Sequence, residues 1–159
     1  MNMDNPLISV VTVAYNAVTT IEKTILSVIN QTYPNVEYII IDGGSTDGTV
    51  EIIKKYANKL AYWVSEPDNG IYDAMNKGAK VATGEWINFM NCGDSFFTKA
   101  VLMDIFSTDN VRDCTDVIYG DTCVVEIWGM YEQRPMEMIN MLKYLSLIHI
   151  SEPTRQEAI

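Results

Sequence analysis

The chain of 159 residues is poor in the residues that several functional classes require. Its single histidine is His149, so chemistry of the Ser-His-Asp or Cys-His type would have to use that residue. Its three cysteines are odd in number and lack paired metal-ligand spacing, which indicates reduced thiols packed as small apolar residues. Eleven Lys and Arg stand against 21 Asp and Glu, and the net charge of −10 argues against a nucleic-acid or anionic-membrane partner.

The sequence also has no long apolar run, and its first residues are not expected to form a leader. No stretch approaches the roughly 20 apolar residues of a membrane span. The segment MNMDNPLISVV carries no basic region before its apolar run, so it is not a secretory signal. A cytoplasmic location is therefore the default expectation. The 48% apolar and 20% charged content is that of a globular protein, and the length predicts one domain or part of one.

Strands and helices are predicted to alternate along the chain. The runs ISVVTVAYN and VEYIII show no polar/apolar alternation, which is typical of strands buried on both faces of a parallel sheet. Strands are expected at 8–16, 36–41, 61–65, 85–91, 116–120 and 122–128, and helices at 19–31, 49–58, 71–82 and 98–107. Thr19 with Glu22 fits a capping box. The pattern predicts a three-layer α/β/α fold with a mainly parallel sheet, with Tyr62, Trp63, Trp86 and Phe89 in its core.

Polar turns follow three of these strands and place Asn16, Asp42 and Asp94 at one edge of the sheet. Open α/β sheets bind ligands at this edge. If the ligand carries phosphates, an acidic site generally needs a divalent cation between the two sets of negative charges. A structural alternative is that Asp42 and Asp47 shape a turn and cap a helix, and that Asp94 is a helix N-cap.

The standard nucleotide-binding signatures are not present. Ser45 stands where the G-x-G-x-x-G fingerprint would need glycine, and no G-x-x-x-x-G-K-[ST] occurs. Dinucleotide binding with the usual fingerprint and a P-loop are therefore poor candidates. A nucleotidyltransferase would want a basic glycine-rich loop after its first strand, and Ala14-Tyr15-Asn16-Ala17 is not one.

Four segments, ISVVTVAYN, IDGGSTDGT, SEPDNGIYDAMNKG and GEWINFMNCGDSF, together resemble a known family in order and spacing. They are similar to the nucleotide-sugar-binding half of family 2 glycosyltransferases with the Rossmann-like GT-A fold, over roughly residues 6–127. The similarity is greatest to a bacterial branch of capsule, exopolysaccharide or O-antigen assembly. It implies inverting transfer of a sugar from a nucleoside diphosphate, expected to be UDP, to a hydroxyl of a surface glycan or lipid-linked glycan.

The resemblance also implies roles for individual residues. It assigns the nucleotide and donor sugar to Val13, Ala14, Tyr15, Asn16, Asp42, Gly43, Asp73, Asn76 and Lys77. Asp94 matches the last acid of an Asp-x-Asp type motif, which implies Mg²⁺ or Mn²⁺ bridging the diphosphate. The chain departs from the family at two positions. Gly43 replaces a second acid used in base recognition, which leaves the donor base open, and Cys92 stands where the metal motif has another acid.

The last part of the chain fits the pattern less well. Residues 1–128 are expected to form the donor-binding half and 129–144 are unassigned. LSLIHISEPTRQ resembles translated adapter or vector read-through, so 145–159 is expected to be a foreign tail. The catalytic base is not identified, and Asp121 is the only candidate near the ligand edge. The chain as given is expected to be poorly active, the alternative being a non-catalytic nucleotide-sugar-binding module. Peripheral membrane association is compatible with the full-length protein.

Overall fold

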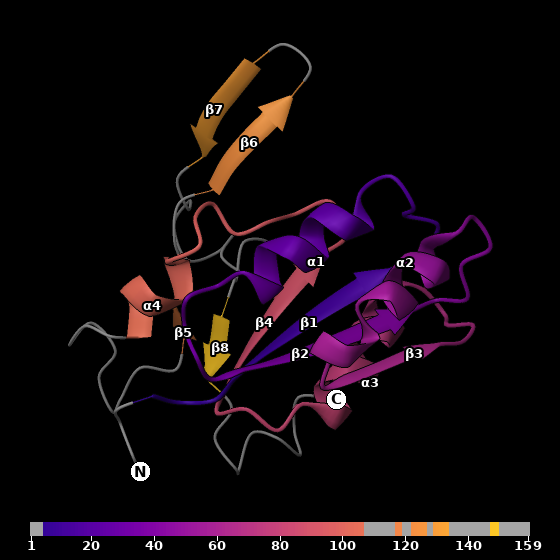
Figure 1. Ribbon diagram of the computed structural model, residues 1–159, viewed down its shortest axis with the longest axis horizontal. Helices are drawn as coiled ribbons and strands as arrows, with labels where there is room; N and C mark the ends of the chain where they lie inside the picture. Colours follow the sequence, from indigo (N-terminus) through magenta and orange to yellow (C-terminus); the bar gives the residue numbers. More distant parts are fainter. Residues whose placement is uncertain (1–4, 107–116, 119–121, 127–128, 134–146, 150–159) are drawn as a thin grey trace.

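The computed structural model describes residues 5–106, 117–118, 122–126, 129–133 and 147–149 (Figure 1). Strands and helices alternate over the first 106 residues, as predicted. The order is β1 (Ile8–Ala14), α1 (Ile21–Ile29), β2 (Val36–Asp42), α2 (Thr49–Lys55), a 3-10 helix (Ala57–Lys59), β3 (Tyr62–Ser65), α3 (Ile71–Val81), β4 (Trp86–Asn91) and α4 (Val101–Phe106).

The main sheet is parallel over four strands, in the order β3-β2-β1-β4. Beyond β4 lie β8 (Leu147–His149) and β5 (Val117–Ile118), and both of their pairings are antiparallel. A separate antiparallel hairpin of β6 (Thr122–Glu126) and β7 (Gly129–Gln133) projects away from this sheet (Figure 1). The prediction of an α/β fold with a mainly parallel sheet is confirmed.

Every residue of β1 is buried, because helices cover both faces of the sheet. Ile8 and Val10 belong to the core beneath α1, α2 and α4, whereas Val11 and Val13 belong to the core beneath α3. The alternation of side chains along a strand thus divides β1 between two cores. The sheet is the middle of three layers, and its carboxyl edge is left open for loops.

Three local expectations were wrong or inexact. Strand β1 ends at Ala14 because Asn16 adopts a left-handed conformation with φ of 47°. The N-cap of α1 is Thr20, without a side-chain cap. Glu22 Oε1 accepts hydrogen bonds from Lys55 Nζ at 2.6 Å and Tyr56 Oη at 2.7 Å, so partners on the neighbouring helix replace the predicted capping box.

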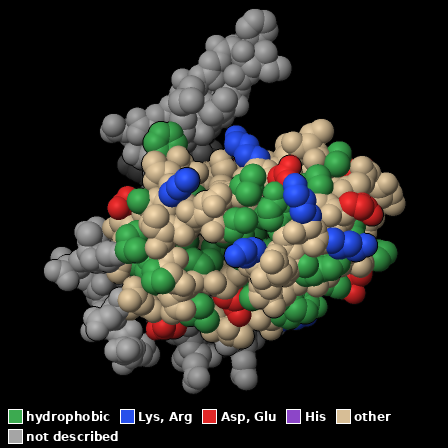
Figure 2. All heavy atoms as spheres, viewed as in Figure 1, with side chains coloured by type: hydrophobic (Ala, Val, Ile, Leu, Met, Phe, Trp, Pro, Cys, Tyr) green, Lys and Arg blue, Asp and Glu red, His purple; other side chains and the backbone are tan. Residues whose placement is uncertain are grey.

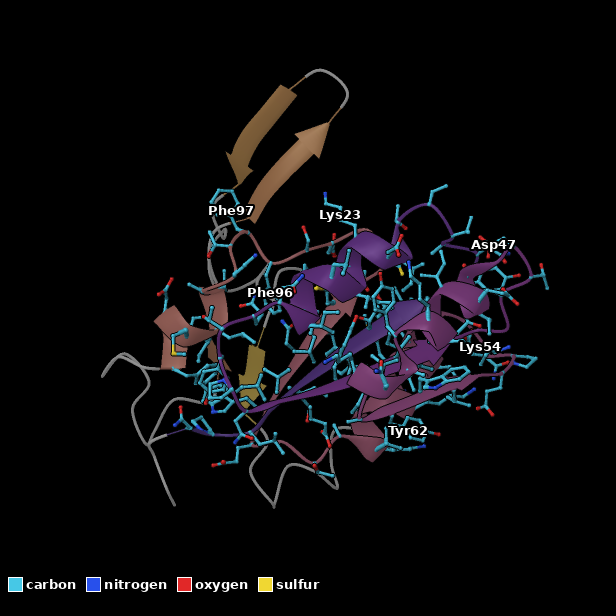
Figure 3. All side chains as sticks on the ribbon, in the orientation of Figure 1. Lys23, Asp47, Lys54, Tyr62, Phe96 and Phe97 are labelled. Carbon is cyan, nitrogen blue, oxygen red and sulfur yellow. The ribbon has the colours of Figure 1, made fainter. Side chains whose placement is uncertain are left out.

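Tyr62 is also not a core residue. It lies on the edge strand β3 and is 42% exposed (Figure 3), because no strand covers that side of β3 in the described sheet. Trp86, by contrast, is buried as predicted and stacks edge-on against Phe106.

The predicted foreign tail contributes to the sheet. Within 145–159 the structure describes only residues 147–149, and these form β8, where His149 pairs with Trp86 and Ile148 with Ile87. The proposed domain boundaries stay predictions. No helix among the described residues has the length and apolar character needed to cross a membrane.

Candidate functional site

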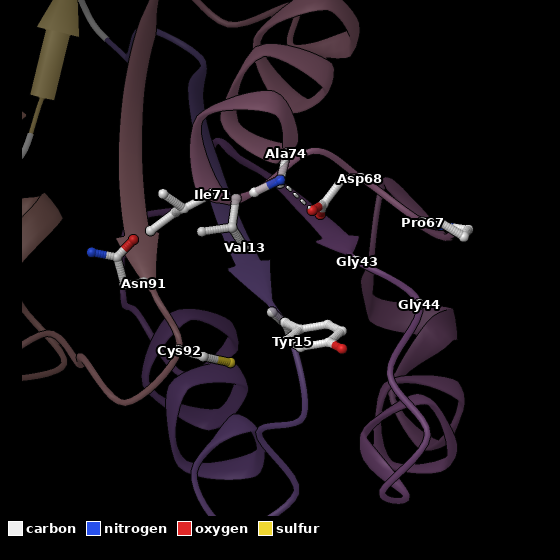
Figure 4. A pocket seen from close by; sticks show the side chains of 12 residues that line it. Val13, Tyr15, Gly43, Gly44, Pro67, Asp68, Ile71, Ala74, Asn91 and Cys92 are labelled. Carbon is white, nitrogen blue, oxygen red and sulfur yellow. Dashed lines mark hydrogen bonds between the residues drawn. The ribbon is translucent and has the colours of Figure 1, made fainter.

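A cavity of about 730 Å³ opens at the carboxyl edge of the sheet (Figure 4). Its walls come from the ends of β1 and β4, the glycine turn after β2, the loop of residues 66–70 that joins β3 to α3, and the first turns of α3. The described lining residues are Val13, Ala14, Tyr15, Gly43, Gly44, Pro67, Asp68, Gly70, Ile71, Ala74, Asn91 and Cys92. Its volume suits a small-molecule ligand, and the lining is mainly apolar with few polar groups.

Asp42 is the acid that directly follows the hydrophobic run of residues 38–41, and its contacts show why an acid stands there. Its side chain is fully buried, and its Oδ2 accepts hydrogen bonds from the backbone N–H of Gly44 at 3.1 Å and of Ser45 at 2.9 Å. Ser65 Oγ donates to the same oxygen at 2.6 Å, and Ser45 Oγ donates to Oδ1. Gly44 has φ of 84°, which only glycine adopts readily. Asp42 therefore builds the turn that forms one wall of the cavity.

The loops after β1 and β2 are joined by side-chain hydrogen bonds. The Asn16 backbone N–H donates to Ser45 Oγ at 2.7 Å, and the Thr46 N–H donates to Asn16 Oδ1 at 3.0 Å. Further along, the Val18 N–H donates to Asp47 Oδ2 at 3.0 Å. A side-chain hydrogen bond from Thr49, together with the backbone donors, holds the pKa of Asp47 below its usual value. The polar residues of GGSTDGT thus fix the rim of the cavity.

Lys77 holds the β3–α3 loop in place through an ion pair and a hydrogen bond. Its Nζ lies 2.9 Å from Glu66 Oε1 and donates to the Pro67 carbonyl oxygen at 3.1 Å, while Asp73 Oδ2 is 3.8 Å away. The hydrogen bond to Glu66 raises the pKa of Lys77. Asp73 Oδ2 also accepts the Asn69 N–H at 3.0 Å. Both predicted contact residues, Asp73 and Lys77, hold the loop that lines the cavity.

The carboxylate of Asp68 lies in the cavity wall, and the sequence did not predict this residue as part of the site. Its Oδ1 accepts the Gly70 N–H at 2.8 Å, which fixes the side chain in the loop. Its Oδ2 points toward the Gly43 backbone, where a Cβ on residue 43 would come within 2.5 Å of it. The only available signal was the turn-forming sequence EPDNG directly before a helix.

Asp94 lies just beyond the cavity, after β4, with an exposed side chain. Partial desolvation raises the pKa of its carboxyl group. The described residues contain no cluster of three His, Cys, Asp or Glu that could hold a metal by itself. A lone carboxylate still fits Mg²⁺, which keeps several waters and combines one or two carboxylates with ligand phosphates.

Cys92 is half-buried in the cavity wall. Burial, followed by the nearby carboxylates of Asp42, Asp94 and Asp47, raises its pKa to about 12. The thiol is therefore neutral at physiological pH in the metal-free protein and is not a reactive thiolate.

The predicted site residues fall into two groups. Val13, Ala14, Tyr15 and Gly43 line the cavity. Asn16, Asp42, Asp73 and Lys77 do not line it but shape the loops around it, and Asn76 is exposed on α3. Asp121 lies outside the described residues. Sequence reasoning missed the other lining residues: Gly44, Pro67, Asp68, Gly70, Ile71, Ala74, Asn91 and Cys92.

The sequence model of the family described as "Glycosyl transferase family 2" matches residues 9–151. The chain belongs to this family. It is 36% identical over 130 residues to an uncharacterised glycosyltransferase of Mycobacterium tuberculosis (strain H37Rv), covering 81% of this chain and 46% of that protein. It is 31% identical over 122 residues to a PGL/p-HBAD biosynthesis glycosyltransferase of Mycobacterium bovis (strain BCG), covering 75% and 48%. This family 2 glycosyltransferase chain thus spans about half the length of these relatives.

Solved structures share the fold of this family 2 glycosyltransferase. The mannosyltransferase PcManGT from Pyrobaculum calidifontis, in complex with GDP-Man and Mn²⁺, is 28% identical with a TM-score of 0.58, covering 62% of this chain and 30% of that one. S. aureus TarS in complex with UDP-GlcNAc is 30% identical with a TM-score of 0.56, covering 62% and 29%. The GT-A fold expected from the sequence is confirmed.

Proposed function

We propose that the cavity binds a nucleoside diphosphate sugar and that the whole protein transfers this sugar to a hydroxyl group. The observation that carries the proposal is the 730 Å³ cavity at the carboxyl edge of β1, β2 and β4 in a family 2 chain. Its position is the one at which open α/β sheets bind ligands. The PcManGT and TarS structures hold GDP-Man and UDP-GlcNAc, which supports a nucleotide-sugar donor.

The lining gives each part of such a donor a suitable surface. Tyr15 is 67% exposed at the rim and presents an aromatic face on which a base can stack. Gly43 and Gly44 allow a ligand to approach the backbone closely. The buried Val13 and Ala74 and the more exposed Ile71 supply apolar contacts in the cavity wall (Figure 4).

We further propose that Asp94 contributes one ligand to Mg²⁺ or Mn²⁺, with the remaining ligands coming from the diphosphate and water. When bound, the cation offsets the diphosphate charge and stabilises the departing nucleoside diphosphate. The chain carries a net charge of −10, so it offers little compensation of its own. The Mn²⁺ in PcManGT supports a cation in this role.

Transfer is proposed to be inverting, with a surface glycan or lipid-linked glycan as acceptor. Such a reaction needs a base within about 3 Å of the acceptor hydroxyl proton. Asp121 remains the candidate for this base from the sequence. We assign the role of base to none of the described residues that line the cavity. The residues on the donor side bind and orient the sugar, and the acceptor side stays a prediction.

Isothermal titration calorimetry with UDP tests the proposed donor site directly. We expect binding in the presence of Mn²⁺ that weakens when EDTA removes the metal. Equal affinity in Mn²⁺ and EDTA would remove the cation from the proposal. No binding of UDP, GDP or their sugars at millimolar concentration with Mn²⁺ would overturn the donor site itself.

A further inference from the structure

The turn after β2 packs closely against an acid from another loop. A Cβ built on Gly43 would lie 2.5 Å from Asp68 Oδ2 and 3.1 Å from its Cγ. The carboxylate of Asp68 therefore occupies the volume that a side chain at position 43 would need. Asp68 and Gly43 lie on the same side of the cavity, across from Asn91 and Cys92 (Figure 4).

We propose that Asp68, and not Asp42, recognises the base of the donor nucleotide by accepting a ring N–H, which selects uracil over cytosine. This inference rests on the proposed donor site. It assigns the base preference that the glycine at position 43 leaves open.

The carboxylate of Asp42 already accepts hydrogen bonds from protein donors at both of its oxygens. Its side chain is fully buried, and Oδ2 already accepts three hydrogen bonds, from Gly44, Ser45 and Ser65. Oδ1 accepts a fourth, from the Ser45 hydroxyl. A carboxylate has about four lone-pair positions, so a ligand could contact Asp42 only by breaking the turn that it holds.

Asp68 has one oxygen fixed and one available. Oδ1 accepts the Gly70 N–H, and the Lys77 hydrogen bond to the Pro67 carbonyl secures the preceding residue. Among the residues that the structure describes, no hydrogen-bond donor contacts Oδ2. Asp68 is one of the residues that line the cavity, so Oδ2 is an acceptor without a described donor at the cavity wall, and the Gly70 contact fixes its position before a ligand arrives.

The chemistry of that oxygen selects among bases. An ionised carboxylate only accepts hydrogen bonds. Uracil presents one ring N–H at N3, which matches the single available oxygen. Cytosine presents an unprotonated N3, whose lone pair would face the carboxylate, and its donor on that edge is the N4 amino group, at the position where uracil has an acceptor. Guanine offers two adjacent donors, which suit a carboxylate with both oxygens free, and Oδ1 of Asp68 is already occupied.

The test compares UDP and CDP by calorimetry in Mn²⁺, using the full chain. We expect the wild-type chain to bind UDP at least about tenfold more tightly than CDP, the size of one hydrogen bond to a charged group. Asp68→Asn should weaken UDP binding by a similar factor and reduce the UDP/CDP ratio toward one, because an amide can donate to cytosine N3. Glu51→Gln is the matched control, since it removes one negative charge from the exposed face of α2 and should leave both affinities unchanged.

Gly43→Ala tests the same contact without removing the carboxylate. Residue 43 is not among the glycines with positive φ, so alanine fits the backbone, and its Cβ must push the Asp68 carboxylate aside. We expect the UDP/CDP ratio to fall as in Asp68→Asn. In an Asp68→Ala background, Gly43→Ala should cause no further fall, because the group that it displaces is gone.

UDP methylated at N3 provides a readout that needs no variant. It lacks the ring N–H, so the wild-type chain should bind it about tenfold more weakly than UDP, and the difference should shrink in Asp68→Asn. If the wild-type chain binds UDP but Asp68→Asn keeps the UDP/CDP ratio, the assignment to Asp68 is wrong and the donor site stands. If no nucleoside diphosphate binds, the donor site and this inference both fail.

Discussion

Asp94 has a feature that separates it from the other acids near the cavity: among the described residues, no side chain donates a hydrogen bond to its carboxylate, and burial raises its pKa against a lowering contribution from the Asn91 backbone alone. Asp42 and Asp47 each accept several. Asp94 is held instead through its backbone, whose N–H donates to the Asn91 carbonyl at 3.0 Å and whose carbonyl accepts from Thr24 at 2.8 Å. The backbone is fixed and the carboxylate is left available to an external cation.

Asp94→Asn should therefore weaken UDP binding by about tenfold or more in Mn²⁺, since a charged ligand is lost. In EDTA the variant should bind UDP as the wild-type chain does. Calorimetry under both conditions measures the effect. Asp104→Asn, which changes an exposed acid on α4, is the control. A similar loss with and without metal would show that Asp94 acts on the nucleotide directly.

At the level of single residues, the sequence predicted the position of the site better than the residues that face it. Four residues that the family resemblance assigned to the donor line the cavity: Val13, Ala14, Tyr15 and Gly43. The polar residues predicted from the strand ends, Asn16, Asp42 and Asp94, are not among the lining residues. The sequence could not distinguish an acid that builds a turn from one that lines a cavity. The role of Asp42 depends on Ser65, which is 23 residues away. Such partners become visible only when strands pair.

Helix α3 approaches the sheet at a glycine. A Cβ on Gly78 would collide with a methyl group of Val11, a fully buried residue of β1, and would also approach Ile41. This close contact places the first turn of α3 at the cavity. The absence of a side chain at position 78 thus positions the element that carries Ile71 and Ala74.

Gly78→Ala should destabilise the fold by about 1–3 kcal/mol, because it overpacks a filled core. The loss should appear even though alanine favours a helix interior by about 1 kcal/mol over glycine. In a Val11→Ala background, where the methyl group is removed, the same change should be neutral or stabilising. Urea unfolding followed by circular dichroism gives all four free energies. An equal loss in both backgrounds would place the cost elsewhere.

Glu37 joins three elements at the other end of the sheet. Its carboxylate on β2 accepts from Ser9 Oγ on β1 and from the N–H and hydroxyl of Thr83, before β4, at 2.8 and 2.7 Å. Burial alone would raise its pKa, but the hydrogen bonds outweigh that effect and lower the pKa below 4.5. The ionised form therefore stabilises the fold.

Glu37→Gln should lower the free energy of unfolding at pH 7 by about 1–3 kcal/mol. Because the folded-state pKa is depressed, the stabilisation is fully present above the unfolded-state value near 4.5. It is lost as pH falls through the folded-state pKa. The difference between wild type and variant should therefore shrink as pH falls below about 4.5. Urea unfolding across that range measures it, and a constant difference would assign the effect to packing.

The sequence predicted the elements of the parallel sheet well, because their apolar runs are long and are bounded by turns. It did not predict β7, and it placed a capping box at the start of α1. The true partners of Glu22 are Lys55 and Tyr56, which come near only when α1 packs against α2. Local sequence therefore specified where the helix lies, and tertiary packing decided how its first turn is held.

The whole molecule is acidic, with a net charge of −10. On the face shown in Figure 2, Lys and Arg side chains are scattered among acidic and apolar ones and do not gather in one patch. An anionic ligand is therefore repelled at long range unless a cation accompanies it. Salt screens this repulsion, since the Debye length falls from about 30 Å at 0.01 M to about 8 Å at 0.15 M.

Raising NaCl from 10 to 150 mM, at ionic strengths of about 0.01 and 0.15 M, should strengthen UDP binding in EDTA. In saturating Mn²⁺ the dependence should be weaker, because the metal complex of UDP carries less charge. Calorimetry at both salt concentrations provides the comparison. If added salt weakens UDP binding in EDTA, a local basic contact attracts UDP more strongly than the net charge of the molecule repels it.

The hydrogen bonds between the loop after β1 and the loop after β2 have a kinetic consequence. Asn16, Ser45, Thr46 and Asp47 tie these loops together without help from a ligand. The conformational entropy of this rim is lost once, during folding, and not again at each encounter with a ligand. Association at this part of the cavity should then be a single-step, second-order process whose rate rises linearly with ligand concentration, with no saturating ordering step of the rim.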